Sequence, residues 1–380
     1  MRLIATADWH IHEFSDFSKV LSVTWDSTSQ RFIELEIPEA KPMNSRLFNI
    51  LNGLCDMRDY ATNNNITHVI NAGDVFHKRG NISVTAFNAV HKVLESFHRA
   101  GISMYIIAGN HDQVDASISP ETSIHTFKDI ACIFEKPQIL SIASGMDGVG
   151  LAFVPYSKDK SFVIEQIHEL KLQLNSKQSI LVAHVGITGG RVGSGMYIMN
   201  DEYSLDDLEY NKWKYVVLGH YHQPQRLADN VIYAGTPVQN SFGDELLDDH
   251  EGGGFNGFYV LDTNEENSMQ FVPIKAPRFI TVKSPGELDR SIKEYGENNF
   301  YRVKASTSDV EEIATMENVR VEVEKEYKEA ARSDIGLNDT FQDAVIKYSR
   351  ENYKGTNSDI TKFGLVILNS VLSGGGADDV

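Results

Sequence analysis

The sequence contains little cysteine and no long apolar run. Only two of its 380 residues are cysteines, Cys55 and Cys132, and neither belongs to a Cys-x-x-Cys pair. This argues against a disulfide framework or a zinc knuckle and fits a reducing compartment. No stretch approaches the ~18 consecutive apolar residues of a membrane-spanning helix. Asp8 interrupts the N-terminal apolar run too early for a signal peptide. We therefore expect a cytoplasmic protein that does not bind membranes.

Positive charge is also scarce. The chain has 35 Lys and Arg against 53 Asp and Glu, which gives a formal net charge of −18. Phosphate contacts normally come from clustered Lys and Arg, so this chain by itself is not expected to bind polyanions non-specifically. If its substrate is DNA, metal ions or a partner protein must supply the positive field.

The chain is nevertheless long enough, and at 41% hydrophobic residues apolar enough, for about two domains and a smaller appendage. Up to about residue 270, apolar β-rich runs alternate with amphipathic segments, a pattern typical of α/β layers. Nearly continuous Val, Ile, Leu and Tyr in each run predicts strands buried on both faces. These runs are RLIATADWH, THVINAGDVF, SMYIIAGNHD, SILVAHVGI, YVVLGHYHQ, VIYAGTPV and GFYVLDT.

One helix is predicted between the second and third runs. Apolar residues recur there every three or four positions, which indicates an amphipathic helix from about 82 to 99 that ends before Gly101. The stripe consists of Val84, Phe87, Val90, Leu94 and Phe97. Such a stripe is more often a core face than an interface.

Changes in composition divide the chain. We predict a main α/β domain over residues 1–273, with an insertion of some hairpin character at 13–42. The order β-α-β-α-β over 274–330 predicts a small separate α/β domain. Residues 331–373 carry two short amphipathic helices. The tail 374–380 lacks packing residues and is expected to be disordered.

His, Asp and Asn residues collect where the predicted strands end. Open α/β sheets bind ligands outside the carboxyl ends of their strands, so groups far apart in the sequence are expected to meet at one edge. They form five blocks: Asp8-x-His10, Gly73-Asp74 followed by His77, Gly109-Asn110-His111-Asp112, His184, and Gly219-His220-Tyr221-His222.

Imidazoles, carboxylates and an amide without thiolates suit a dinuclear centre of Mn, Fe, Zn or Co. The predicted assignment is Asp8, His10 and His222 on one metal, Asn110, His184 and His220 on the other, and Asp74 as the bridge. Two cations ~4 Å apart lower the pKa of a shared water and clamp phosphate oxygens during in-line attack. The blocks therefore predict phosphoester hydrolysis.

Three residues remain as catalytic candidates. His111 adjoins the ligand Asn110 but has no metal role, so we predict that it protonates the departing sugar oxygen. Asp112 would orient that imidazole or raise its pKa, and His77 would contact the phosphate. The alternatives are that His111 is a buried histidine held by Asp112, and that His77 is simply exposed. Asp8, Asp74 and Asp112 would singly also be explained as strand-end caps.

In order and setting, the five blocks resemble those of the calcineurin-like metallophosphoesterases. Within that superfamily the chain resembles the SbcD subunits, called Mre-eleven nucleases in eukaryotes and archaea, including their phage relatives. GDVFHKRG, AGNHD, GHYHQPQ and YAGTPVQNSFGDE carry this likeness. The sequence motifs that carry this likeness lie within residues 1 to about 275. The small domain resembles that of the family only in the order of its strands and helices.

The resemblance implies an α/β fold: a metallophosphoesterase β-sandwich flanked by helices, with a small α/β capping domain and helical C-terminal arms. It also implies a dinuclear-metal exonuclease and endonuclease that uses two divalent ions, Mn(II) or else Mg(II). A homodimer is expected, with a dimer surface near the 82–99 helix. The expected partners are DNA and an SbcC-like (Rad-fifty-type) ATPase in DNA repair and recombination, in a bacterial cell or a phage-infected host.

Two rivals share these motifs. One is a phosphatase of the same superfamily, which Arg79-Gly80 favours. Asp112 opposes it, because that branch usually closes its Asn-His block with Glu. The other is an inactive scaffold subunit, which the complete ligand set opposes. The C-terminal helices are expected to dock the ATPase; the alternative is that they pack on the capping domain.

Overall fold

A computed structural model gives the fold. It describes residues 1–115, 120–142, 148–174, 178–193, 197–200, 202–246, 250–305, 318–323, 340–352 and 357–372. Contacts divide the chain into two compact units, Met1–Val323 and Glu324–Val380, and each is described by itself.

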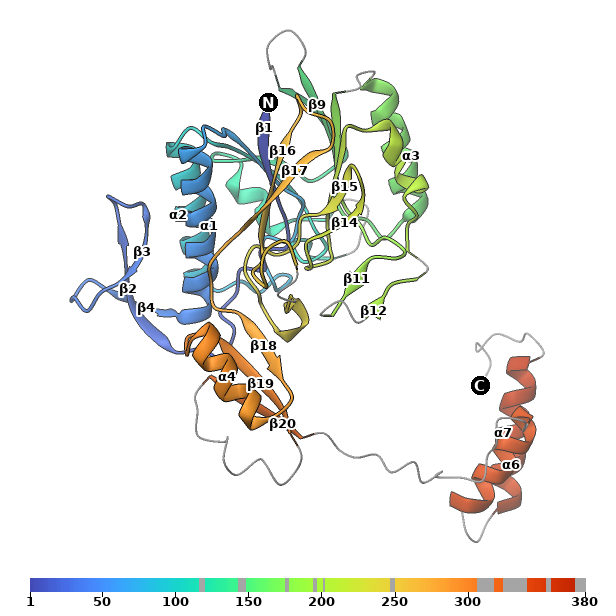
Figure 1. The fold of residues 1–380 in the computed structure, drawn as a ribbon. Helices are drawn as coiled ribbons and strands as arrows, with labels where there is room; N and C mark the ends of the chain where they lie inside the picture. Colours follow the sequence, from blue (N-terminus) through green and yellow to red (C-terminus); the bar gives the residue numbers. More distant parts are fainter. Residues whose placement is uncertain are drawn as a thin grey trace. The chain divides into compact units, whose positions relative to one another are not determined.

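Two six-stranded sheets form the centre of the first unit (Figure 1). In each sheet four neighbouring strands run parallel and antiparallel strands complete it. The first sheet has the order β17 (Ser268–Pro273), β16 (Gly257–Asp262), β1 (Arg2–Thr6), β5 (His68–Asn71), β6 (Ser103–Ile107) and β7 (Cys132–Phe134). The second has the order β14 (Gln225–Ala228), β15 (Val231–Tyr233), β13 (Tyr215–Gly219), β10 (Ser179–His184), β9 (Val149–Val154) and β8 (Gln138–Ile142).

Alternation along the strands separates the core into layers. Leu3 and Ala5 of β1 pack between the sheets, whereas Ile4 packs on the opposite face, against α1 (Ser45–Asn63) and α2 (Val84–Arg99). In β10 the same alternation places Leu181 toward α3 (Lys160–Gln173). The predicted β-sandwich flanked by helices is confirmed, and β10, buried along its whole length, shows why its sequence is continuously apolar.

Helix α2 follows the prediction at both ends. The Ser83 side chain caps it by accepting from the backbone N–H of Ala86, and Gly101 takes a φ of 73° just after its end. Its apolar stripe lies inside the core, because Val90, Leu94 and Phe97 are fully buried. Of the five stripe residues only Val84, at 75%, is largely exposed. The stripe is therefore used within the chain, and the dimer surface expected near this helix stays a prediction.

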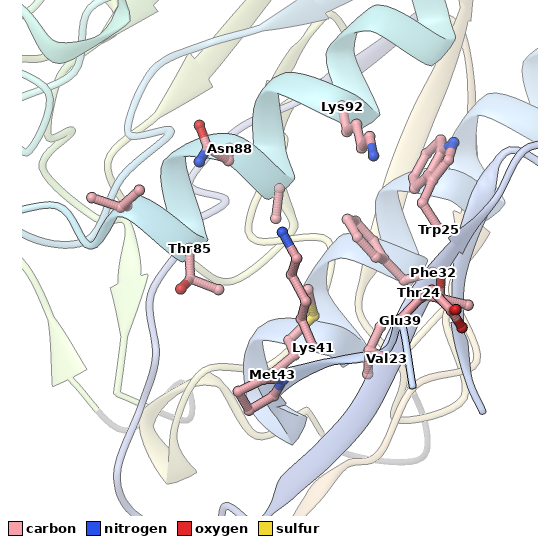
Figure 2. A pocket seen from close by; sticks show the side chains of 13 residues that line it. Val23, Thr24, Trp25, Phe32, Glu39, Lys41, Met43, Thr85, Asn88 and Lys92 are labelled. Atoms are coloured by element: carbon pink, nitrogen blue, oxygen red, sulfur yellow. The ribbon is translucent and has the colours of Figure 1, made fainter. Parts of the chain in front are cut away.

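The insertion at 13–42 contains the expected hairpin. Strands β2 (Val20–Asp26) and β3 (Arg31–Glu34) pair antiparallel, and β4 (Lys41–Asn44) joins the other side of β2. Arg31 fixes this small sheet to α1 through ion pairs of 2.7 and 2.9 Å with the carboxylates of Asp56 and Asp59. A cavity of about 580 Å³ lies between the sheet and α2, with Trp25 and Lys92 on its walls (Figure 2).

A second small sheet completes the first unit. Strands β18 (Phe279–Val282), β19 (Phe300–Ala305) and β20 (Val319–Val323) run parallel, and α4 (Pro285–Tyr295) connects the first two and packs on them. The second helix expected here falls on residues 306–317, outside the described residues. The boundary proposed at 273 lies inside the first unit and stays a prediction.

The second unit contains the two expected C-terminal helices, α6 (Phe341–Asn352) and α7 (Asn357–Leu372), which pack on each other. The predicted disordered tail 374–380 lies outside the described residues. Within the described part of the chain, no helix is long and apolar enough to span a membrane. The remaining short elements are β11 (Arg191–Val192), β12 (Tyr197–Ile198) and the 3-10 turns Ser123–Phe127, Asp206–Leu208, Tyr210–Lys212 and Phe242–Asp244.

Candidate metal centre

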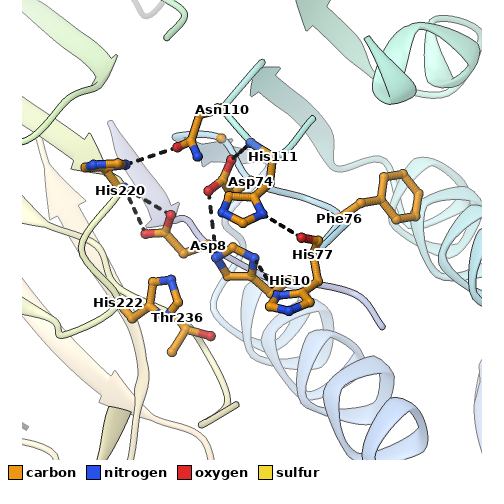
Figure 3. Close-up of polar contacts among 12 residues, drawn as sticks. Asp8, His10, Asp74, Phe76, His77, Asn110, His111, His220, His222 and Thr236 are labelled. Atoms are coloured by element: carbon orange, nitrogen blue, oxygen red, sulfur yellow. Dashed lines mark hydrogen bonds and ion pairs between the residues drawn. The ribbon is translucent and has the colours of Figure 1, made fainter. Parts of the chain in front are cut away.

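Four of the five sequence blocks meet at one end of the two sheets in Figure 3, and His184, the fifth, lies beside Asp74 and Asn110. The blocks of Asp8, Asp74 and Asn110 follow β1, β5 and β6 of the first sheet, and His184 and His220 end or follow β10 and β13 of the second. The backbone N–H of His220 joins the sheets by donating to both carboxylate oxygens of Asp8, at 3.0 and 3.2 Å. The blocks were expected to meet at one edge of a sheet. They meet instead where the ends of two stacked sheets lie side by side.

The backbone at this end is held in an unusual conformation. Asp8, His10, Asp74 and His220 have φ values of 52°, 47°, 58° and 107°, in the left-handed half of the map that side chains other than glycine rarely adopt. Such conformations cluster at functional sites, where the surrounding fold enforces them. Here they turn four predicted ligands out of their strands toward one another.

Asp74 lies at the middle of the cluster. Its Oδ1 accepts the backbone N–H of His111 at 2.8 Å. Its Oδ2 lies 3.7 Å from Nε2 of His10 and 3.5 Å from Nε2 of His184. One carboxylate oxygen thus faces an imidazole of each predicted ligand group, which suits a bridging ligand.

The protein atoms alone leave this cluster unsatisfied. Nε2 of His10 is buried and has no hydrogen-bond partner. His184 donates its Nδ1 hydrogen to the Ala72 carbonyl at 2.7 Å, so Nε2 is the nitrogen that the ring, once neutral, would offer to a metal. This nitrogen lies 3.0 Å from Oδ1 of Asn110, a second predicted ligand. Converging acceptors are what a divalent cation needs, and the residues present therefore fit a metal centre.

The remaining predicted ligands adjoin these atoms. Nδ1 of His220 lies 3.1 Å from the same Asn110 oxygen. The rings of His10 and His222 lie 4.5 Å apart between centroids. The structure brings all seven predicted ligands together, and His10, Asp8 and Asp74 offer ligand atoms within 4.8 Å of one another. Their division between two metals stays a prediction.

Charges in the cluster are strongly coupled. Burial raises the pKa of Asp8 to about 6. Burial alone would lower the pKa of His184, but the Asp74 carboxylate raises it to about 9. The pKa of His222 also rises to about 9, because Asp244 outweighs burial. In the chain by itself, protons on these imidazoles balance the buried carboxylates, a role that bound cations would take over.

Asp244 is a site residue that sequence reasoning missed. It is buried, and its Oδ1 accepts the Nδ1 hydrogen of His222 at 2.8 Å. Its Oδ2 accepts the backbone N–H groups of Asn240 and Ser241 at 2.8 and 3.1 Å. This fixes the tautomer of His222 with Nε2 free for a metal. The Ser-x-x-Asp pattern at 241–244, a capping box, was the available signal.

We expect Asp244→Asn to weaken Mn²⁺ binding roughly 10- to 100-fold, as outer-shell changes usually do. An amide that keeps accepting from the backbone turns its NH₂ toward His222, which forces the imidazole hydrogen onto Nε2, the atom intended for the metal. Calorimetric titration with MnCl₂ measures the affinity. Glu245→Gln is the matched control, because that carboxylate binds Thr281. Equal affinities in the two variants would contradict this role.

The three catalytic candidates also lie here. His111 donates its Nδ1 hydrogen to the His77 carbonyl at 2.5 Å, which leaves Nε2 for another partner. His10, His77 and His111 offer ring nitrogens within 4.8 Å of one another. Nδ1 of His77 lies 3.4 Å from Nδ1 of His10, and the ring of His12 stacks on His77 with a centroid distance of 5.3 Å. His77 thus contacts the predicted ligand His10. The prediction had given His77 only a contact with the phosphate.

Asp112 does not hold the His111 imidazole as expected. Its two oxygens accept backbone N–H groups, those of Phe76 at 3.1 Å and Gly109 at 3.0 Å. A buried carboxylate satisfied in this way braces the two loops that carry Asp74 and Asn110. The alternative that His111 is a buried histidine held by Asp112 fails for the same reason.

The sequence is similar to a family of hydrolases and to several individual proteins. The calcineurin-like phosphoesterase model matches residues 1–224, which include all seven predicted ligands. The chain is 25% identical over 226 residues to Exonuclease subunit 1 of Enterobacteria phage T4, covering 59% of this chain and 60% of that protein. It is 21% identical over 266 residues to the DNA double-strand break repair protein Mre11 of Methanocaldococcus jannaschii, covering 68% and 66%.

A third relative, the SbcD component of the nuclease SbcCD of Staphylococcus epidermidis, is 22% identical over 334 residues, covering 80% of this chain and 78% of that protein. The chain thus spans less than two thirds of the first two relatives and more of the third. The family model covers more than half of this chain, together with all seven predicted metal ligands. The protein belongs to the calcineurin-like phosphoesterases, a family of metal-dependent hydrolases.

Proposed function

We propose that this protein is a dinuclear-metal nuclease that hydrolyses DNA phosphodiester bonds with Mn²⁺. The observation that carries the proposal is the set of buried, converging acceptors on His10, Asp74 and His184, in a chain similar to three nuclease or DNA-repair proteins. Bound metals would activate a water molecule and neutralise the phosphate. Because they carry positive charge, they would also compensate locally for the net charge of −18.

Residues of the chain itself would complete the reaction. His111 is the proposed general acid: the His77 carbonyl fixes its Nδ1 hydrogen, so its Nε2 is the end that would reach the leaving oxygen. Asp112 would act only by bracing the loops around it.

A nuclease assay with end-labelled linear duplex tests this function. The protein is incubated with MnCl₂, MgCl₂ or EDTA, with and without an SbcC-type ATPase. A generic phosphodiester and a phosphomonoester are assayed in parallel. Mn²⁺-dependent cutting of duplex supports the nuclease. Turnover of the monoester alone would establish the phosphatase alternative, and binding of metal without any turnover would leave the scaffold alternative.

We further propose that the second unit docks an SbcC-type ATPase. Large apolar side chains on its two helices are open to solvent: Phe341 is 72% exposed, Phe363 60% and Val366 64%. Amphipathic helices commonly place such a face in a groove of another protein. The predicted metal ligands all lie in the first unit, so docking and metal binding are expected to be separable.

Removal of residues 331–380 should therefore leave metal content and weak Mn²⁺-dependent cutting intact while abolishing co-purification of the ATPase. Full-length Phe363→Asp with Val366→Asp should lose the ATPase equally, because a charge in an apolar interface is costly. Pull-down and metal analysis measure both effects. Unchanged affinity of the truncated chain for the ATPase would show that docking lies elsewhere, and loss of metals would show that the helices support the first unit.

A homodimer, which the family likeness implies, also belongs to the proposal. Light scattering at micromolar concentration should report about twice the chain mass of 42.5 kDa. The dimer surface must differ from the buried stripe of α2. A monomer that cuts DNA at full rate would contradict this assembly.

A further inference from the structure

A cavity of about 470 Å³ lies beside the metal centre, at the junction of the insertion, the main sandwich and the small sheet. His77 lines it and also lies 3.4 Å, between Nδ1 atoms, from the predicted ligand His10 (Figure 3). The start of the insertion forms one wall, residues 240–243 form another, and Phe279 and Arg320 come from the small sheet.

The walls are aromatic and rigidly held. The ring centroid of Phe14 lies 4.9 Å from that of His77, and Phe17 and Phe242 lie 5.7 Å apart. The buried guanidinium of Arg46, in the same lining, lies 4.9 Å from the Phe14 ring and 4.7 Å from the Phe279 ring. It also donates to the carbonyls at 16 and 240 over 3.0 and 2.7 Å, which ties the two walls together. A site fixed in this way needs little ordering to bind a ligand.

Two further features of the lining need an explanation. Phe17 has a φ of 56°, a conformation that is a genuine outlier for a bulky side chain. Asn240 is 7% exposed, and its Oδ1 is buried without a hydrogen-bond partner. Backbone strain of this kind is found at sites that bind a ligand.

The cavity does not suit an anion. The guanidinium of Arg46 is occupied by backbone carbonyls and aromatic rings. The other lining cation, Arg320, pairs with Asp16 at 3.4 Å. An uncharged, flat ligand would instead stack on the aromatic side chains of the lining.

We propose that this cavity binds the nucleobase of the nucleotide whose phosphate lies at the metals; the inference rests on the proposed nuclease function. Its volume is within the range of small-molecule sites. Bases stack on aromatic side chains whatever their identity, so the cavity would position any terminal nucleotide for cleavage. Phe14 and Phe17, at the beginning of the insertion, would then form one wall of the base site.

Binding of two probes to the Mn²⁺-loaded full chain tests the inference by calorimetry: dAMP, and 2-deoxyribose 5-phosphate, which lacks the base. We expect dAMP to bind about 5- to 150-fold more tightly, the range for one stacked base. Phe14→Leu and Phe242→Leu keep apolar volume but lose the aromatic face, so the preference for dAMP should largely disappear while sugar-phosphate affinity stays. Phe162→Leu, a half-buried Phe on α3, is the control and should retain the preference.

A second arm compares cutting of a duplex with cutting of the same duplex carrying an abasic terminal nucleotide. Slower cutting of the abasic end by wild type, but not by Phe242→Leu, supports the base site. Equal binding of the two probes by wild type, or an undiminished preference in both Phe variants, overturns it. If neither duplex is cut, the nuclease proposal fails, and the calorimetric comparison still decides whether the cavity recognises a base.

Discussion

Asp74→Asn is expected to remove bound Mn²⁺ and to abolish hydrolysis of every phosphoester. Asp74 Oδ2 faces Nε2 of both His10 and His184, so this one substitution removes an anionic ligand from both sides of the centre. Outer-shell changes alone cost about 10- to 100-fold in metal affinity. We therefore expect the loss of a bridging ligand to exceed about 100-fold for at least one metal.

Metal analysis after dialysis, together with turnover of a generic phosphodiester, measures this effect. The Asn side chain has nearly the same shape and can still accept the N–H of His111, so the fold should be kept, which thermal unfolding checks. Asp207→Asn, which changes a carboxylate paired with Lys160 at the surface, should bind metal normally. A metal-loaded, active Asp74→Asn protein would exclude Asp74 as the bridge.

His111→Ala is expected to keep its metals but to cut DNA about 10²- to 10⁴-fold more slowly, the usual contribution of a positioned acid. The backbone N–H of His111, not its ring, contacts Asp74, so removal of the ring leaves that hydrogen bond in place. Metal content should therefore be close to that of the wild type. Single-turnover cutting of labelled duplex gives the rate.

The identity of the leaving group separates an acid from a merely structural histidine. A p-nitrophenyl ester of thymidine 5′-phosphate releases an oxygen that needs no proton, so His111→Ala should hydrolyse it at nearly the wild-type rate. His168→Ala, at a surface pair with Glu209, is the control. Equal losses on both substrates would indicate that His111 supports the centre rather than protonating the leaving oxygen. Loss of metal would instead make it a ligand.

Several local features could be predicted because they depend on short stretches of sequence. The apolar runs ending in Asp, Asn or His specified β1, β5, β6, β10 and β13 and the residues that follow them. The periodic stripe specified α2. Strand β9 was not among the predicted runs, although VGLAFV is buried along its whole length between β10 and β8 in the second sheet.

Features that depend on contacts between distant segments were missed or misjudged. Asp244 reaches His222 from a turn 22 residues away, and its short capping motif does not reveal that partner. Asp112 was expected to hold its neighbour His111, but the fold directs it to Gly109 and Phe76.

The sequence alone determined which chemical groups are present and that each follows a strand, because strand length and periodicity are local properties of the chain. From these it determined the family and a metal-dependent hydrolase. Only the tertiary structure decided that the groups come from two stacked sheets, that Nε2 of His10 remains unsatisfied, that Nε2 of His184 lies against Asn110, and that Phe14 adjoins His77. Such relations depend on packing between residues tens to hundreds of positions apart. Local sequence does not specify them, because many side chains share the same local pattern and differ only in what the fold places against them.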